Sequence, residues 1–331
     1  MPTSLHDVSA PAKLNLFLHV TGRRADGYHL LQSVFTLIDW ADTLHFETRA
    51  HRQHDGGLSR EDLTTPLPAD DLVLRAARAL QAATGHAGGA HIAIAKHIPA
   101  QAGLGGGSSD AASTLLALNR LWKLKLSLEQ LAAIGLTLGA DVPYFLHSAH
   151  AKQATAWVEG VGERITPLPA NLEPARLLPG HALLVVKPDA GLETAAIFRD
   201  PALKRDSFAA TITGFAADPG VGSASEEKPN DVEHNRDRGA QSFRKFLLED
   251  SRNDLQPVAQ RLCPGVTQAL EWLNSLGLSG RMTGSGSAVF AWVAPEMHVR
   301  ARFSSTAIAV PDQMQSRWCR SLDVHPLAHW A

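Results

Sequence analysis

The feature that most constrains this chain is a glycine-rich segment at residues 99–110, with the sequence PAQAGLGGGSSD. It follows a strand-like stretch at His91–Ile98 and precedes Ala111–Trp122, where apolar residues recur at helical spacing. Consecutive glycines let a backbone adopt conformations closed to other residues and approach a ligand closely. Amides at the start of a helix carry the positive end of its dipole, so strand, glycine loop and helix together predict a phosphate-binding site.

A simpler interpretation of the same segment is a flexible turn capped by Ser108 or Ser109. The segment is not a Walker loop, because no Gly-Lys-Ser/Thr follows it. It does not fit Gly-x-Gly-x-x-Gly, because Ser108 occupies the place of the last glycine, and it does not fit the Gly-x-Ser-x-Gly elbow of serine hydrolases. Taken alone, the segment leaves phosphate binding and a structural turn both open.

Composition narrows the class of protein. A length of 331 residues predicts about two domains, and 31 basic against 33 acidic residues give no basic surface for nucleic acid. Only two cysteines occur, Cys263 and Cys319, which favours a reducing compartment, although a bridge between them stays open. The N-terminus lacks an apolar signal segment and no run approaches about 18 apolar residues, so we expect a cytoplasmic protein without membrane or nucleic-acid partners.

The order of expected elements indicates an α+β fold in two halves. Alternation over Lys13–Val20 predicts a half-buried strand with Lys13 and Asn15 on one face. Further strands are expected at Ser33–Ile38, Thr43–Glu47, His181–Lys187 and Ala288–Ala294. Helices are expected from a cap at Asp70 to Gly85, from a Ser127–Gln130 capping box to about Gly139, and at Phe243–Leu248 and Val266–Leu276. Residues 218–240 are rich in charge, glycine and proline and are expected to form a mobile surface insertion.

Two more segments could carry chemistry. Residues 139–143 (GADVP) place Asp141 just past a helix and before a proline, which would hold a carboxylate as a general base requires. Asp141 could equally be a turn former. Residues 281–288 (RMTGSGSA) form a small-residue turn leading into a strand, and a tight turn explains them equally well.

Together, residues 11–16 (PAKLNL), 103–109 (GLGGGSS), 139–143 and 283–288 (TGSGSA) resemble the motifs of the GHMP kinases in order and separation. This family includes galactokinase and the homoserine, mevalonate and phosphomevalonate kinases. The resemblance covers nearly the whole chain except the 218–240 segment. It implies the two-domain GHMP kinase fold, with an ATP-binding half at residues 1–160 that is similar to ribosomal protein S5 domain 2 and a ferredoxin-like half at residues 161–331.

Residues 24–29 (RADGYH), 160–163 (GVGE) and 197–201 (IFRDP) narrow the resemblance to one branch of the family. The acceptor in that branch is the 2-hydroxyl of the methylerythritol unit of a cytidine diphosphate ester, in non-mevalonate isoprenoid biosynthesis. The resemblance implies ATP as phosphoryl donor, with Mg²⁺ carried as the ATP complex and its protein ligands unknown. The chain is expected to be a monomer or a homodimer.

The resemblance also implies roles for individual residues. Asp141 takes or orients the hydroxyl proton, and Lys13 beside it counters charge on the transferred phosphoryl group. The expected ATP-binding residues are Lys96, Pro99, Ala100, Gln101, Ala102, Gly103, Leu104, Gly105, Gly106, Gly107, Ser108 and Ser109. The expected substrate-binding residues are Asn15, Tyr28 stacking on cytosine, His29 reading the base edge, and Phe198 on the other face of the ring. Structural roles stay open for three of these: Lys13 as a solvated strand residue, Asn15 as a backbone partner and Phe198 as a core aromatic.

The chain departs from the family pattern at two positions. Asp71 and Asp110 stand where the family often has asparagine, near the adenine and after the two serines. A carboxylate near phosphates is unfavourable unless it faces away or helps to hold magnesium. The remaining alternatives are a GHMP kinase for a different alcohol and a non-catalytic nucleotide sensor with the same fold.

Overall fold

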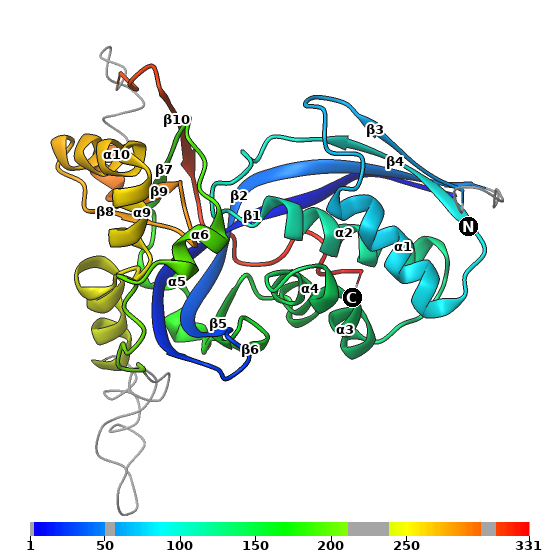
Figure 1. The fold of residues 1–331 in the computed structure, drawn as a ribbon, viewed down its shortest axis with the longest axis horizontal. Coiled ribbons are helices and arrows are strands. Elements are labelled where there is room, and N and C mark those ends of the chain that lie inside the picture. The colour runs from blue at the N-terminus through cyan, green and yellow to red at the C-terminus, as the bar shows by residue number, and fades with distance from the viewer. Residues whose placement is uncertain (1–2, 50–56, 211–237, 299–308, 331) are drawn as a thin grey trace, which may run out of the picture.

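The computed structural model of the chain describes residues 3–49, 57–210, 238–298 and 309–330. Its first sheet contains six strands, β1 (Ser4–Arg23), β2 (His29–Arg49), β3 (Leu58–Asp62), β4 (Gly89–Ala95), β5 (Thr155–Gly160) and β6 (Arg164–Pro167). The long strand β2 pairs antiparallel with β1 on one side. On its other side it pairs with β4 and β5, which meet different stretches of it. The sheet is therefore built around one hairpin, β1–β2 (Figure 1).

The β1–β2 hairpin differs from the sequence prediction in two ways. The two strands expected at Ser33–Ile38 and Thr43–Glu47 form one continuous strand, β2. β1 is not half-buried, because both of its faces are covered from residue 10 to residue 20. Val8 packs in the core beneath the helices, whereas Leu14 packs in a second core that includes residues of the second half of the chain. Alternation therefore predicted the strand but not that a second layer would cover its polar face.

Four helices pack with this sheet around the first core, α1 (Leu72–Thr84), α2 (Gly106–Leu121), α3 (Leu128–Leu138) and α4 (Val142–Ala151). The predicted capping box of Ser127 and Gln130 begins α3, and the predicted Gly85, in a left-handed conformation, ends α1. The predicted cap at Asp70 is wrong: Asp71 caps α1, and Asp70 instead pairs with Arg78. Both aspartates are capping residues by type, so only the backbone geometry distinguishes them.

Helix α2 begins at Gly106, not at the predicted Ala111. Its N-cap is Gly105, whose φ of 70° is left-handed and which makes no side-chain capping bond. Ser108 and Ser109 lie inside the first turns of the helix and do not cap it. The glycine-rich segment is thus a loop up to residue 105 and a helix N-terminus from residue 106, which is the arrangement that favours anions.

The second sheet is antiparallel in the order β10-β7-β9-β8, with β7 (Ala182–Pro188), β8 (Gly280–Met282), β9 (Val289–Val293) and β10 (Met314–Cys319). It packs with α9 (Gln256–Leu262) and α10 (Pro264–Ser275) in a third core. Shorter elements are η1 (Ala170–Leu172), α5 (Pro174–Leu177), α6 (Thr194–Arg199) and the π-helical turn η2 (Phe246–Asp250) after helical residues 238–245. The α+β prediction is confirmed.

The expected insertion at 218–240 lies outside the described residues, except for helical residues 238–240. Within the described part of the chain, no helix is long and apolar enough to cross a membrane.

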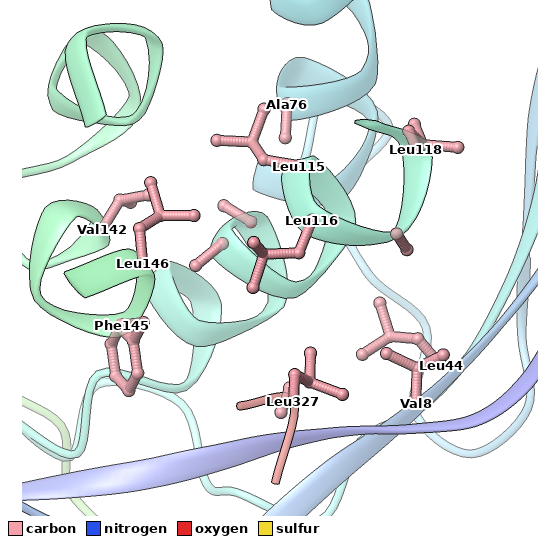
Figure 2. Packing of buried hydrophobic residues seen from close by; sticks show 14 of the residues in the cluster. Val8, Leu44, Ala76, Leu115, Leu116, Leu118, Val142, Phe145, Leu146 and Leu327 are labelled. Atoms are coloured by element: carbon pink, nitrogen blue, oxygen red, sulfur yellow. The ribbon is translucent and has the colours of Figure 1, made fainter. Parts of the chain in front are cut away.

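The C-terminal segment, residues 320–330, returns from the second sheet to the first. The Leu322 amide donates to the Leu37 carbonyl at 2.9 Å, and the Ala154 amide donates to the Asp323 carbonyl at 3.2 Å. Leu327 is only 3% exposed and joins the first core, among the apolar side chains of α2 and α4 (Figure 2). The last residues therefore help to complete the core of the first half.

We expect Leu327→Ala to lower the free energy of unfolding by about 2–4 kcal/mol, because it removes buried methyl groups and leaves a cavity. Val324→Ala is the matched control, because Val324 is 47% exposed in the same segment. Urea denaturation of both variants measures the effect. Equal stability of the two variants would show that the segment does not contribute to the core.

Candidate active site

A cavity of about 1610 Å³ brings together segments that are far apart in the sequence. Its walls come from β1, the 23–29 turn, the loop between β4 and α2, the start of α4, helix α6 and the turn between β8 and β9. Every residue predicted for the site except Ser109 lines it: Lys13, Asn15, Tyr28, His29, Lys96, residues 99–108, Asp141 and Phe198. Ser109 is fully buried within α2.

Lys13, Asn15 and Asp141 form a compact polar group in this cavity. The Lys13 Nζ donates to Asn15 Oδ1 at 2.6 Å and lies 3.3 Å from Asp141 Oδ2. Lys13 is only 3% exposed, and its Nζ stands 4.6 Å from the centre of the Phe35 ring. It is therefore a buried cation held by two oxygen partners and not a solvated strand residue.

Local structure explains why these three side chains meet. The Asn15 Nδ2 donates to Ser33 Oγ at 3.0 Å, so the amide oxygen is left to face Lys13. Asp141 stands at the N-cap of α4 with Pro143 in the first turn, yet its carboxylate accepts no capping bond. That carboxylate, 31% exposed, is directed to Lys13 and the cavity instead of its own helix.

The glycine loop fits against the turn between β8 and β9. Gly103 has a φ of 73°, and a Cβ there would lie 2.3 Å from the Thr283 carbonyl oxygen. The Ala288 amide donates to the Ala102 carbonyl at 3.1 Å, and the Asn15 amide donates to Thr283 Oγ1 at 2.8 Å. The small residues at 281–288 therefore do more than form a tight turn, because they let two backbones touch behind the loop.

Gly103→Ala is expected to lower the free energy of unfolding by at least about 2 kcal/mol, because a left-handed conformation and a backbone contact both oppose a Cβ. Gly107→Ala is the matched control, since its Cβ would meet only the end of the Leu72 side chain, at 3.2 Å. Thermal and chemical denaturation of both variants compare their stability. The proposed contact is refuted if the two alanines behave alike.

A buried charge cluster lies beside the loop. The Lys96 Nζ donates to Asp110 Oδ2 at 2.6 Å and to Asp42 Oδ2, and Asp42 Oδ1 accepts the amides of His97 and Ile98. Burial raises the pKa of Asp110 to about 8, although Lys96 opposes the shift. Burial works against the charge of Lys96, but the two carboxylates outweigh it and raise its pKa. Lys96 therefore lines the cavity while its ammonium group is paired with Asp42 and Asp110.

The two departures from the family pattern each have a cation beside them. Asp110 has Lys96, and Asp71 lies 2.6 Å from Arg60 Nη1 while it caps the Leu74 amide at 3.2 Å. The Asp71 carboxylate therefore pairs with Arg60 and caps the start of α1. No group of three or more histidine, cysteine or acidic residues in the described chain could hold a metal ion.

The raised pKa of Asp110 predicts that this residue lowers the free energy of unfolding as the pH rises. A carboxyl whose pKa is higher in the folded protein contributes stability at low pH, and that contribution is lost as pH rises through the folded value of about 8. We therefore expect Asp110→Asn to gain at least about 1 kcal/mol in unfolding free energy relative to wild type between about pH 5 and pH 8. Asp70→Asn is the control, because the Asp70 carboxylate is 71% exposed. Parallel pH profiles of wild type and Asp110→Asn would contradict the expectation.

The other end of the cavity is lined by the aromatic side chains of Tyr28, His29 and Phe198. Tyr28 is 62% exposed on a turn in which the Arg24 amide donates to the Tyr28 carbonyl at 2.7 Å. The His29 and Phe198 rings lie 5.0 Å apart between centres at 31°. Burial, then Arg205 and Arg23, lower the pKa of His29. Arg205 also lines the cavity and was missed by sequence reasoning, because no motif surrounds it.

The comparisons with known proteins agree with this geometry. Residues 71–149 match the model of the GHMP kinases N terminal domain, and residues 234–306 match that of the GHMP kinases C terminal. A 4-diphosphocytidyl-2-C-methyl-D-erythritol kinase of Albidiferax ferrireducens is 58% identical over 99% of this chain and 96% of its own length. The chain belongs to the GHMP kinase family.

Solved structures of GHMP kinases share this fold. A crystal structure of 4-(cytidine 5'-diphospho)-2C-methyl-D-erythritol kinase is 31% identical, with a TM-score of 0.65 over 94% of this chain and 98% of that one. A homoserine kinase from Cytophaga hutchinsonii is 15% identical, with a TM-score of 0.61 over 98% and 97% of the two chains, which shows the fold alone. The two-domain GHMP kinase fold implied by the sequence is confirmed.

Proposed function

We propose that this GHMP kinase transfers the γ-phosphoryl group of ATP to the 2-hydroxyl of 4-(cytidine 5'-diphospho)-2-C-methyl-D-erythritol, giving the 2-phosphate and ADP. The reaction would serve isoprenoid precursor synthesis by the methylerythritol phosphate pathway. The observation that carries the proposal is the Lys13–Asp141 pair, which shares one cavity with the N-terminus of α2 and with the rings at Tyr28, His29 and Phe198. The names of the relatives supply the substrate.

Phosphoryl transfer requires positioned groups and compensation of charge more than covalent chemistry from the protein. The start of α2, with residues 106–108 on the cavity wall, would bind the ATP phosphates through its amides. Asp141 would orient the acceptor hydroxyl and accept its proton, since its carboxylate is open to the cavity. Lys13, buried beside it, would counter the charge that develops on the transferred group.

The cavity offers one carboxylate that could bind the Mg²⁺ ion of the ATP complex. Mg²⁺ on a nucleotide usually needs one or two carboxylates in addition to the phosphates. Asp110 would supply one, because its Oδ1 is buried without a hydrogen-bond partner in the described structure and the residue lines the cavity. A Mg²⁺ ion bound there would neutralise phosphate charge.

The base would bind at the other end of the cavity. Tyr28 is exposed enough to stack on cytosine, and the His29 ring is held against Phe198. Asn15 would reach the acceptor through the amide that also holds Lys13. A nucleotide sensor without activity would not need the buried Lys13–Asp141 pair, and a kinase for galactose, homoserine or mevalonate would not need a base site.

The remaining expectations are inferences of the same kind. Both cysteines, Cys263 and Cys319, are free and buried, which supports action in a reducing compartment such as the cytoplasm. A division near residue 160 is supported by the two family models, which match on either side of it.

Asp141→Asn is expected to lower kcat about 100-fold or more, because the amide cannot accept the proton, while the melting temperature stays near that of wild type. The stability should hold because the carboxylate makes no capping bond, and because the substituted amide keeps an oxygen that can face Lys13 in place of the carboxylate. A coupled ADP-release assay measures the rate with the cytidylyl substrate, and with homoserine, galactose and mevalonate as control acceptors. Near wild-type turnover would remove Asp141 from the mechanism, and a preference for another acceptor would overturn the substrate.

A further inference from the structure

Arg205 connects the parts of the cavity that would hold the base. Its Nε donates to His29 Nε2 at 3.0 Å, although the two residues are 176 positions apart. Its Nη2 donates to the carbonyl oxygens of Phe198 at 3.1 Å and Asp200 at 2.8 Å, and its Nη1 donates to that of Leu203 at 2.9 Å. Four hydrogen bonds therefore fix the orientation of the guanidinium plane. One of them holds the Nε2 atom of His29 against an N–H donor.

The bond to Nε2 has a consequence for the His29 ring. A guanidinium has only donors, so the nitrogen facing it must accept, and a neutral imidazole carries its single proton on the other nitrogen. A protonated ring would place two N–H groups against each other. Arg205 therefore selects the neutral tautomer with the proton on Nδ1, and no described residue hydrogen-bonds that nitrogen.

A donor at Nδ1 distinguishes two bases that have almost the same shape. Cytosine presents an acceptor at its N3 position, whereas uracil presents an N–H donor there. A donor facing uracil would leave two N–H groups opposed and unpaired, and such a mismatch costs more than a missing contact. The opposite tautomer, with an acceptor at Nδ1, would reverse this preference.

We propose that Arg205 is a positioning residue that holds His29 in the Nδ1–H tautomer and thereby makes the site selective for cytosine over uracil. The base selectivity rests on the proposed function, whereas the tautomer itself does not. Arg205 needs no contact with the substrate, because it acts through the His29 ring and through the backbone that carries Phe198.

The tautomer can be measured without substrate. Long-range ¹H–¹⁵N NMR of the histidine side chains, with the His29 signals assigned from their loss in His29→Gln, should show Nδ1 protonated and Nε2 unprotonated in wild type. Arg205→Met should redistribute the proton toward Nε2. Lys204→Met is the matched control, because it removes the same charge at the neighbouring position from an exposed side chain. An Nε2–H ring in wild type, or an unchanged ring in Arg205→Met, overturns the proposal.

Kinetics test the selectivity. Arg205→Met should raise KM for the cytidylyl ester about tenfold and reduce the cytidine-over-uridine ratio of kcat/KM by a similar factor, with KM for ATP unchanged. Arg205→Lys, which keeps the charge but not the guanidinium plane, should lose selectivity as well and serves if the methionine variant does not fold. An unchanged ratio in a folded variant overturns the selectivity. If wild type accepts no cytidylyl ester, the proposed function fails, and the NMR result alone decides whether Arg205 fixes the tautomer.

Discussion

The site depends on a backbone contact between two distant segments of the chain. The loop at Gly103 and the turn at Thr283 approach so closely that no side chain fits between them. This contact also places Asn15, whose amide donates to Thr283 Oγ1. Because β1, the glycine loop and the second sheet meet at this point, a shift of the turn would move both the Lys13–Asp141 pair and the start of α2.

Buried charges around the cavity occur in compensated groups. Lys13 has Asn15 and Asp141, and Lys96 has Asp42 and Asp110. A buried ion whose partner is removed is far more costly than the pair itself, so such groups constrain one another. A cation stands beside each of the two aspartates that depart from the expected pattern, Arg60 beside Asp71 and Lys96 beside Asp110.

Sequence patterns predicted what local chemistry determines. The capping box at Ser127, the shared face of Lys13 and Asn15, and the strand–loop–helix order were read from spacing alone. The start of α2 at Gly106 was not, because glycines have low helix propensity and only the left-handed turn at Gly105 and the packing around it hold them in the helix. Arg205 was missed because its role depends on a hydrogen bond to His29, which lies 176 residues earlier in the chain. A local sequence pattern cannot predict a contact over such a separation.

The returning C-terminal segment has a consequence for biosynthesis. A ribosome releases the strands and helices of the first half long before residues 320–330, which supply Leu327 to its core and hydrogen bonds to Leu37 and Ala154. Contacts between segments that are far apart in the sequence also carry a high loop-closure cost, so they form late. The first half therefore emerges with part of its apolar core uncovered, and it completes that core only after residues 320–330 have left the ribosome.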